Sequence, residues 1–331
     1  MVRAIGISRY GDASVLEQWD RPLTRPGPGE VLVRVEFAGI NFMDVHTRQG
    51  KYATSHTYPV RLPTGLGMEG AGIVVEAGDG VSGFDAGARV AWCLSWGSYA
   101  DYAIVPARRL APVPPELELS QAAASIFQGL TAHYLAHDVG RLSPRSTCLV
   151  HAASGAVGRL LVQYAHALGA TVIASTSSPA KAEIVRNLGA DHVLRYDQPN
   201  LADQVRALTG GAGADVVYDA IGSPTLRESI RATAVRGLVV NYGSVAGNVD
   251  DLSPIELGEA GSLFLTRPRL ADHVRDLETF RSRAASVFTA LARGTLSVEP
   301  GPVYSFDRVA EAHAALEGRR QQGKSLLDPH R

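Results

Sequence analysis

The chain has 331 residues, which exceeds the roughly 100 to 200 residues of a typical domain, so we expect two domains that each bury a core. Its 32 Lys and Arg residues nearly balance its 33 Asp and Glu residues, and no basic block is present. This excludes nucleic acid and membrane surfaces as expected partners. Neither a signal-peptide pattern nor a long apolar stretch is found, which predicts a cytoplasmic protein.

The first part of the chain, up to about residue 115, is predicted to be a compact β domain. It is rich in Gly, Pro and Val, and its short apolar runs, such as 31–35 and 71–75, are separated by turn residues. The loop at 94–99 contains Trp96 and would suit one wall of an apolar pocket. The two cysteines, Cys93 and Cys148, lack the CxxC spacing of a disulfide framework, a zinc lobe or an iron–sulfur site.

From about residue 119 onward, helical segments alternate with apolar strands. Six strands are expected, at 147–151, 171–174, 192–194, 214–218, 237–241 and 262–265. Such alternation predicts an α/β fold with a parallel sheet, and six strands are what a complete dinucleotide-binding sheet requires. The tail after residue 268 is assigned to the first domain. We therefore expect one domain from 1–123 and 271–331, and a second domain from 124–270.

A small-residue turn follows the first of these strands and precedes a helix at 159–168. Ala152, Gly155 and Gly158 form an AxxGxxG pattern there. The glycines permit a tight turn and the close approach of a pyrophosphate, which rests on the unpaired N–H groups at the helix N-terminus. The turn therefore predicts a dinucleotide site, with these cofactor-binding residues: Ala152, Ser154, Gly155, Ala156, Val157 and Gly158.

The end of the next strand predicts which dinucleotide binds. An NAD enzyme carries an Asp or Glu there for the ribose hydroxyls, whereas this chain carries hydroxyl residues at 175–178, followed by Lys181. Hydroxyls and an ammonium suit a 2′-phosphate. NADPH is therefore favoured over NADH, with Ser177 and Lys181 among its ligands. The alternative is that Lys181 is an ordinary solvated lysine at a helix start.

Further motifs follow one another in a specific order along nearly the whole chain. They lie at 39–44, 48–50, 65–72, 121–124, 128–132, 216–219 and 261–268. Together they resemble the quinone oxidoreductase (zeta-crystallin-like) branch of the medium-chain dehydrogenase/reductase superfamily. The resemblance implies a GroES-like β-barrel catalytic domain, a Rossmann doubly wound parallel sheet, a cleft between them, and a C2 homodimer joined through the strand at 261–268.

The resemblance also implies further ligands for NADPH. Tyr196 would lie beside Lys181 on the ribose phosphate. Gly243 and Ser244 would flank the nicotinamide side. Arg319 would reach the cofactor from the C-terminal tail, the alternative being a surface arginine. The remaining candidates for cofactor binding are Asn41, His46, Gln128, Thr131 and Tyr134.

Two positions argue against a catalytic metal. Zinc-dependent relatives use a cysteine and a His-Glu pair as ligands, whereas this chain holds Asn41 at the first position and Met68 before Glu69 at the second. An amide and a thioether cannot replace thiolate and imidazole around Zn²⁺. We therefore expect no metal site.

Without a metal, the small-molecule acceptor must itself be electrophilic enough to take hydride, as quinones and enones are. Asn41 is predicted to donate an amide N–H to the developing oxyanion, and Tyr52 a phenolic hydrogen bond. The alternatives are a turn-forming asparagine and a tyrosine of the pocket wall. His46 is a possible proton donor that titrates near neutral pH, the alternative being a spectator histidine.

These features favour an NADPH-dependent quinone oxidoreductase. Two other functions remain open. One is a reductase of 2-alkenal or enoyl double bonds, for which Arg267 and Arg269 are candidate anchors of a carrier. The other is a non-catalytic, crystallin-like NADPH-binding protein. Turnover with quinones or alkenals separates the first two functions, and tight NADPH binding without turnover indicates the third.

Overall fold

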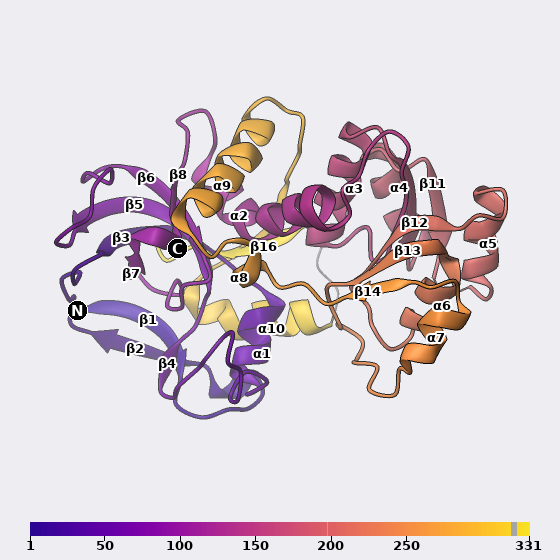
Figure 1. Cartoon of the computed structure of the whole chain (residues 1–331). Helices are drawn as coiled ribbons and strands as arrows, with labels where there is room; N and C mark the ends of the chain where they lie inside the picture. The colour runs from indigo at the N-terminus through magenta and orange to yellow at the C-terminus, as the bar shows by residue number, and fades with distance from the viewer. Residues whose placement is uncertain (197, 319–322) are drawn as a thin grey trace. The chain divides into compact units, whose positions relative to one another are not determined.

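The computed structural model describes residues 1–196, 198–318 and 323–331. The chain divides into two compact units: the first unit consists of Met1–Leu130 and Val274–Arg331, and the second unit of Thr131–His273. The indigo N-terminal strands and the yellow C-terminal elements therefore belong to the same unit (Figure 1). These divisions lie near the expected domain boundaries at 123/124 and 270/271.

Mostly antiparallel strands build the first unit and form two sheets. The smaller sheet has the order β2-β1-β4, and the larger one the order β15-β16-β3-β5-β6-β8, with β7 also paired to β3. Alternate residues of β3 are fully buried because successive side chains of a strand point to opposite faces. The strands are β1 (Val2–Ile7), β2 (Glu17–Arg21), β3 (Glu30–Gly39), β4 (Thr64–Gly65), β5 (Glu69–Ala77), β6 (Arg89–Cys93), β7 (Tyr102–Pro106), β8 (Leu110–Pro112), β15 (Pro300–Tyr304) and β16 (Lys324–Leu327).

Helices from both ends of the chain pack on these sheets. Asp276 begins α9 because its carboxylate accepts a hydrogen bond from the Thr279 N–H at 2.7 Å. Arg281 then attaches α9 to β8 through the Leu110 carbonyl at 3.3 Å. The tail is thus an integral part of the first unit. The α-helices are α1 (Phe42–Arg48), α2 (Leu119–Tyr134, which continues into the second unit), α9 (Leu277–Ala292) and α10 (Val309–Glu317).

The second unit contains one six-stranded sheet in which every pair of neighbouring strands is parallel. Its order, β11-β10-β9-β12-β13-β14, is the 3-2-1-4-5-6 order of a doubly wound dinucleotide-binding sheet. The predicted Rossmann sheet and its six strands are therefore confirmed. They are β9 (Thr147–Val150), β10 (Thr171–Thr176), β11 (His192–Arg195), β12 (Ala214–Asp219), β13 (Thr233–Asn241) and β14 (Phe264–Thr266).

The helices of the second unit connect these parallel strands. Pro179 and Pro254 stand in the first turns of α4 and α7, where a missing N–H costs nothing. The carboxyl ends of the strands consequently meet at one edge of the sheet, where ligands bind in folds of this kind. The helices are α3 (Ala156–Ala167), α4 (Pro179–Asn187), α5 (Leu201–Leu208), α6 (Leu226–Ala232), α7 (Pro254–Glu259) and α8 (Leu270–His273).

Candidate active site

The AxxGxxG turn connects β9 to α3 in the second unit. Ala152 adopts a left-handed φ of +49°, and Gly155 then caps α3 with extended backbone. A Cβ on Gly158 would lie 2.5 Å from the Ala152 carbonyl oxygen and 2.8 Å from the Ala153 Cα, so only glycine lets the helix pack this closely on the turn. Gly155 and Ala156 are exposed, which leaves the N-terminus of α3 open to an anion.

Ser177 and Lys181 follow the carboxyl end of β10, and Tyr196 follows the end of the neighbouring strand β11. The Lys181 ammonium donates to the Ser177 hydroxyl at 3.2 Å. Ser178 begins α4 by accepting a hydrogen bond from the Lys181 N–H at 3.4 Å. The Tyr196 N–H donates to the Thr176 carbonyl at 3.3 Å, which holds the end of β11 against the end of β10. A hydroxyl and an ammonium thus stand side by side in the second unit.

The loop after β13 contains Gly243 and Ser244 and is held by Arg267 from the end of β14. The Arg267 guanidinium donates to the Asn241 amide oxygen at 2.5 Å, to the Gly243 carbonyl at 2.6 Å and to the Ser244 hydroxyl at 3.3 Å. A Cβ on Gly243 would lie 2.7 Å from the Ala220 carbonyl, so this loop also packs closely on its neighbour. Arg267 therefore orders the loop, a role that its sequence position did not reveal.

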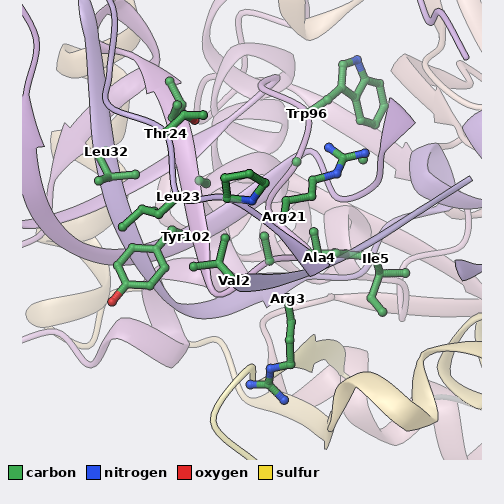
Figure 2. Close-up of a pocket in the computed structure, with 17 residues that line it drawn as sticks. Val2, Arg3, Ala4, Ile5, Arg21, Leu23, Thr24, Leu32, Trp96 and Tyr102 are labelled. Atoms are coloured by element: carbon green, nitrogen blue, oxygen red, sulfur yellow. The ribbon is translucent and has the colours of Figure 1, made fainter. Parts of the chain in front are cut away.

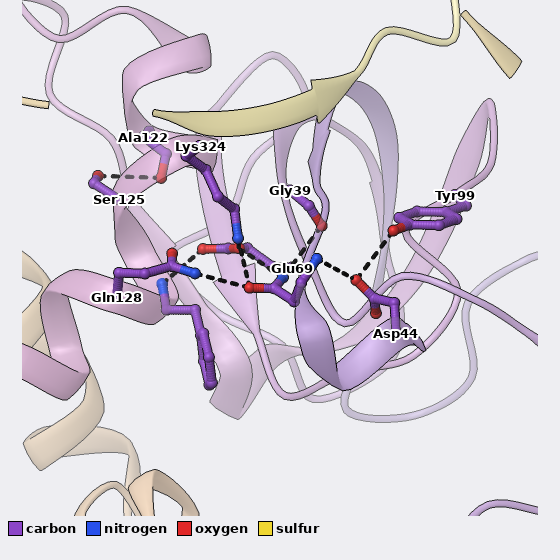
Figure 3. A network of polar contacts seen from close by, with 10 residues as sticks. Gly39, Asp44, Glu69, Tyr99, Ala122, Ser125, Gln128 and Lys324 are labelled. Atoms are coloured by element: carbon purple, nitrogen blue, oxygen red, sulfur yellow. Dashed lines mark hydrogen bonds and ion pairs between the residues drawn. The ribbon is translucent and has the colours of Figure 1, made fainter. Parts of the chain in front are cut away.

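Asn41 is the shared partner in a buried polar cluster of the first unit. Figure 3 labels Glu69, Gln128 and Lys324 of this cluster. Its amide nitrogen donates to the Glu69 carboxylate at 2.9 Å and to the Gly39 carbonyl at 3.2 Å. Its amide oxygen accepts from the Gln128 amide at 2.8 Å and from the Lys324 ammonium at 2.5 Å. Both hydrogens and both lone pairs of the amide are engaged, so donation from Asn41 to an oxyanion requires one of these bonds to break.

Glu69 and Lys324 form an ion pair inside this cluster. The Lys324 ammonium lies 2.7 Å from Glu69 Oε2, and the two side chains are only 5% and 0% exposed. The other carboxylate oxygen, Oε1, accepts the Phe127 N–H at 2.7 Å. Neither charged residue was expected at the site. Glu69 stands inside the predicted motif at 65–72, but nothing local distinguishes Lys324 from a surface lysine at a strand start.

A second buried chain of polar groups starts at the backbone of Asn41. The Asn41 N–H donates to Asp44 Oδ2 at 2.8 Å, and the Tyr99 hydroxyl donates to the same oxygen at 3.0 Å. His313 Nε2 lies 3.3 Å from the Tyr99 hydroxyl, and the Arg48 guanidinium lies 3.5 Å from His313 Nδ1. Burial raises the pKa of Asp44 to about 7 and lowers the pKa of His313 to about 3.

His46 and Tyr52 lie near each other in and after α1. Their ring centroids are 6.1 Å apart, and Tyr52 packs edge-on against Tyr58 at 5.7 Å. Burial, with help from the charge of Lys51, lowers the pKa of His46 to about 4. The imidazole is therefore neutral at pH 7. The expectation that His46 titrates near neutral pH is wrong, because the sequence does not reveal how far the ring is buried.

A cavity of about 240 Å³ opens elsewhere in the first unit (Figure 2). Trp96 lines it, as expected for the loop at 94–99, but so do Arg3 and Arg21. Arg21 lies over the Trp19 ring at 4.0 Å from its centroid. The cavity is consequently bordered by cations and does not have the purely apolar wall that the sequence predicts. Asn41 is not among its lining residues.

The comparisons with known proteins identify the family. Residues 27–115 match the alcohol dehydrogenase GroES-like domain, and residues 156–275 match the zinc-binding dehydrogenase family. A quinone oxidoreductase of Pseudomonas aeruginosa is 36% identical over 99% of this chain and 100% of its own length. The chain belongs to the quinone oxidoreductase family. The predicted family and the GroES-like and Rossmann folds are thereby confirmed.

Two further similar proteins bear on the acceptor and on the cofactor. A 2-haloacrylate reductase of a Burkholderia species is 36% identical, with 99% of both chains covered. The crystal structure of the Escherichia coli quinone oxidoreductase complexed with NADPH superposes with a TM-score of 0.93 at 34% identity, covering 99% of this chain and 100% of that one. The chain is therefore similar both to a quinone oxidoreductase crystallised with NADPH and to a reductase that is named for a different acceptor.

The other predicted residues of this family member are distributed between the two units. Thr131 and Tyr134 are buried at the start of the second unit, where the Tyr134 ring stacks on His273 at 4.1 Å. Arg319 lies outside the described residues.

Across residues 1–196, 198–318 and 323–331, no three His, Cys, Asp or Glu side chains are grouped so that they could hold a metal ion. Within the same ranges, no helix has the length and apolarity needed to cross a membrane.

Proposed function

We propose that this member of the quinone oxidoreductase family oxidises NADPH and reduces a small electrophilic acceptor, with quinones as the first candidates. The observation that carries the proposal is the pairing of Ser177 with Lys181 at the end of β10, where an NAD enzyme would carry a carboxylate. A carboxylate would repel a 2′-phosphate, whereas an ammonium beside a hydroxyl attracts it. The NADPH complex of the Escherichia coli relative supports the same cofactor.

The residues of the second unit fit NADPH. The close packing at Gly158 and the exposed start of α3 suit a pyrophosphate, so Ala152, Ser154, Gly155, Ala156, Val157 and Gly158 are assigned to it. Ser177, Lys181 and Tyr196 are assigned to the 2′-phosphate end. The other proposed ligands are Asn41, His46, Gln128, Thr131, Tyr134, Gly243, Ser244 and Arg319. In this scheme 124–270 is the NADPH-binding domain, and 1–123 with 271–331 is the catalytic domain.

The bound cofactor would supply a hydride from its reduced nicotinamide. The chain contributes binding, orientation and electrostatics. Tyr52 remains the proposed hydrogen-bond donor to the reduced acceptor, and the neutral His46 packs against it. A metal is not assigned a role, because Asn41 and Met68 do not offer zinc ligands and Glu69 is already paired with Lys324.

The relative named 2-haloacrylate reductase favours a second candidate acceptor, an activated carbon–carbon double bond. NADPH oxidation is therefore to be measured with naphthoquinone and phenanthrenequinone, and in parallel with 2-alkenals, 2-haloacrylates and enoyl thioesters. Faster turnover of the quinones is the expected result. Faster turnover of the double bonds would favour the second candidate, and tight NADPH binding without any turnover would indicate a non-catalytic protein.

Lys181→Ala is expected to weaken NADPH binding by about tenfold to 100-fold, because one charge-assisted contact contributes about 1.5 to 3 kcal/mol. The affinity for NADH should stay nearly constant. Arg186→Ala is the matched control, since Arg186 is an exposed cation on the same helix. Titration of NADPH fluorescence measures both. Equal losses for NADPH and NADH, or equal effects of the two variants, would contradict the assignment.

We also propose a homodimer that works in the cytoplasm. The edge strand β14 leaves Phe264 61% exposed, and the neighbouring Val235 is 72% exposed. An apolar sheet edge of this kind is usually paired or covered, and a second copy can pair with it through a twofold axis. The two cysteines are buried free thiols, which suits a reducing compartment.

Phe264→Asp is expected to convert the dimer into a monomer, because it places a carboxylate in the centre of the proposed apolar interface. Sedimentation velocity measures the change. Leu208→Asp is the control, since Leu208 is 41% exposed and lies on α5, which contacts the opposite edge strand β11. A wild-type protein that sediments as a monomer would reject the dimer.

A further inference from the structure

Lys324 is a buried cation in the first unit that has no part in the proposed binding of NADPH. It is the first residue of β16, and its ammonium contacts Glu69 Oε2 at 2.7 Å and Asn41 Oδ1 at 2.5 Å. An ammonium carries three hydrogens. Among the described residues, these two oxygens are the acceptors that it reaches, so one hydrogen is left for another partner (Figure 3).

Stability alone does not explain this ion pair. Removing two charges from water costs several kcal/mol per ion, and well-packed apolar residues are often at least as stable in the same place. The pair is tolerated because both oxygens of the Glu69 carboxylate are hydrogen-bonded: Oε1 accepts the Phe127 N–H, and Oε2 accepts both Asn41 Nδ2 and the Lys324 ammonium. Its retention in the interior therefore points to a role other than stability.

The Lys324 ammonium also fixes the orientation of Asn41. Lys324 and the Gln128 amide nitrogen are both donors, so the oxygen of the Asn41 amide must face them and its nitrogen must face Glu69. Gln128 provides a second observation. Its Oε1 is buried and accepts no hydrogen bond from the described residues. Buried acceptors normally have a donor, so this oxygen and the unused Lys324 hydrogen indicate that a ligand able to donate and accept hydrogen bonds adjoins the cluster.

We propose that Lys324 belongs to the active site and that its ammonium, held in place by Glu69 and Asn41, donates its remaining hydrogen to the oxygen that becomes negative on the reduced acceptor. This inference rests on the proposed function. The acceptor gains a hydride and becomes an oxyanion, the nicotinamide is correspondingly oxidised, and the oxyanion then takes one proton from water. A charged hydrogen-bond donor fixed in a water-poor environment lowers the energy of such an anion without the help of a metal ion.

The proposal makes the effect of Lys324 depend on the acceptor. Lys324→Met removes the charge at similar length, and kcat/KM is to be measured with a series of substituted quinones. We expect a loss of about tenfold for the quinones whose reduced anions are least basic, rising to about 100-fold for those whose reduced anions are most basic. If Lys324 had only a structural role, Lys324→Met would lower kcat/KM by the same factor for all acceptors, and that result would overturn the proposal.

The double variant Lys324→Met with Glu69→Gln separates folding from electrostatics. Lys324→Met alone leaves the Glu69 charge unpaired and is expected to lower stability, whereas the double variant removes both charges and should regain the wild-type unfolding midpoint. Its acceptor-dependent loss of kcat/KM should nevertheless persist. Recovery of activity together with stability would show that the ion pair only supports the fold, and would overturn the proposal.

An equilibrium measurement completes the test. In the presence of NADP⁺, Lys324→Met should bind an anionic hydroxynaphthoquinone about tenfold more weakly, while its affinity for neutral naphthoquinone stays within about twofold. Equal changes for both ligands would overturn the proposal while leaving the proposed function intact. A wild-type protein that binds NADPH and reduces none of the acceptors would instead overturn the proposed function, and this inference with it.

Discussion

Gly158→Ala is expected to abolish measurable NADPH binding and to destabilise the second unit by about 3 kcal/mol. The added Cβ would lie 2.5 Å from the Ala152 carbonyl oxygen and within 2.9 Å of two Ala153 backbone atoms. These atoms cannot move aside easily, because the Ala152 carbonyl accepts the Gly155 N–H and the Ala153 N–H donates to Ser175. The start of α3 must therefore shift away from the turn that is to hold the pyrophosphate.

Gly155→Ala is the matched control for this prediction. Gly155 has an ordinary φ of −75°, and its added Cβ would meet a single atom, the Ala152 carbonyl oxygen, at 3.1 Å. We expect near-normal stability for Gly155→Ala and a weaker effect on binding. Calorimetric unfolding and NADPH fluorescence titration measure the two properties. If Gly158→Ala binds NADPH like the wild type, the turn is not the phosphate site.

The sheet of the second unit was predictable because its signals are local. Each strand is an apolar run, each turn has its own residue pattern, and a parallel order follows from the alternation with helices. The turn after β9 shows the same principle. Ala152, Gly155 and Gly158 lie within seven positions of the sequence, and their pattern predicts that the helix packs closely on the turn. The geometry that this pattern predicts is the geometry observed at Gly158.

The Asn41 cluster was only half predictable because its partners are distant in sequence. Asn41 belongs to a recognisable motif, but its bonds come from β5, α2 and β16, which meet only in the folded chain. The prediction that Asn41 donates to an oxyanion did not take these partners into account. Burial has the same effect on His46, whose pKa is lowered by an environment that no sequence pattern encodes. Local residue types therefore singled out Asn41 as a candidate, and tertiary contacts determined the chemistry of its surroundings.

The buried groups Asp44 and His313 should make the stability of the first unit depend on pH. In the folded protein burial raises the pKa of Asp44 from 3.8 to about 7, and burial with the nearby Arg48 charge lowers the pKa of His313 from 6.5 to about 3. Between about pH 4 and 6.5, folded Asp44 holds a proton that the unfolded chain has released. Over the same range, folded His313 lacks a proton that the unfolded chain binds.

The two groups therefore change stability in opposite directions as the pH rises. The contribution of Asp44 is complete below its unfolded pKa and is lost as the pH rises through about 7, with a slope of about −1.4 kcal/mol per pH unit. The contribution of His313 is complete above its unfolded pKa and is lost as the pH falls through about 3, which gives the opposite slope. In the wild type the two slopes cancel.

Removing either group should expose the slope of the other. Asp44→Asn can still accept hydrogen bonds from the Asn41 N–H and the Tyr99 hydroxyl, so it removes the titration and keeps the contacts. Relative to the wild type, its free energy of unfolding should rise by about 3 kcal/mol from pH 4.5 to 6.5. His313→Gln should show a fall of similar size.

Urea unfolding measures this difference, and tryptophan fluorescence assigns it to the first unit because Trp19, Trp92 and Trp96 all lie there. The double variant Asp44→Asn with His313→Gln is the decisive control. It lacks both titrations, so its stability should again run parallel to that of the wild type over this pH range. Single variants that also run parallel would mean that the two groups titrate normally in the folded protein, and that the buried chain from Asn41 to Arg48 is more open to water than its contacts indicate.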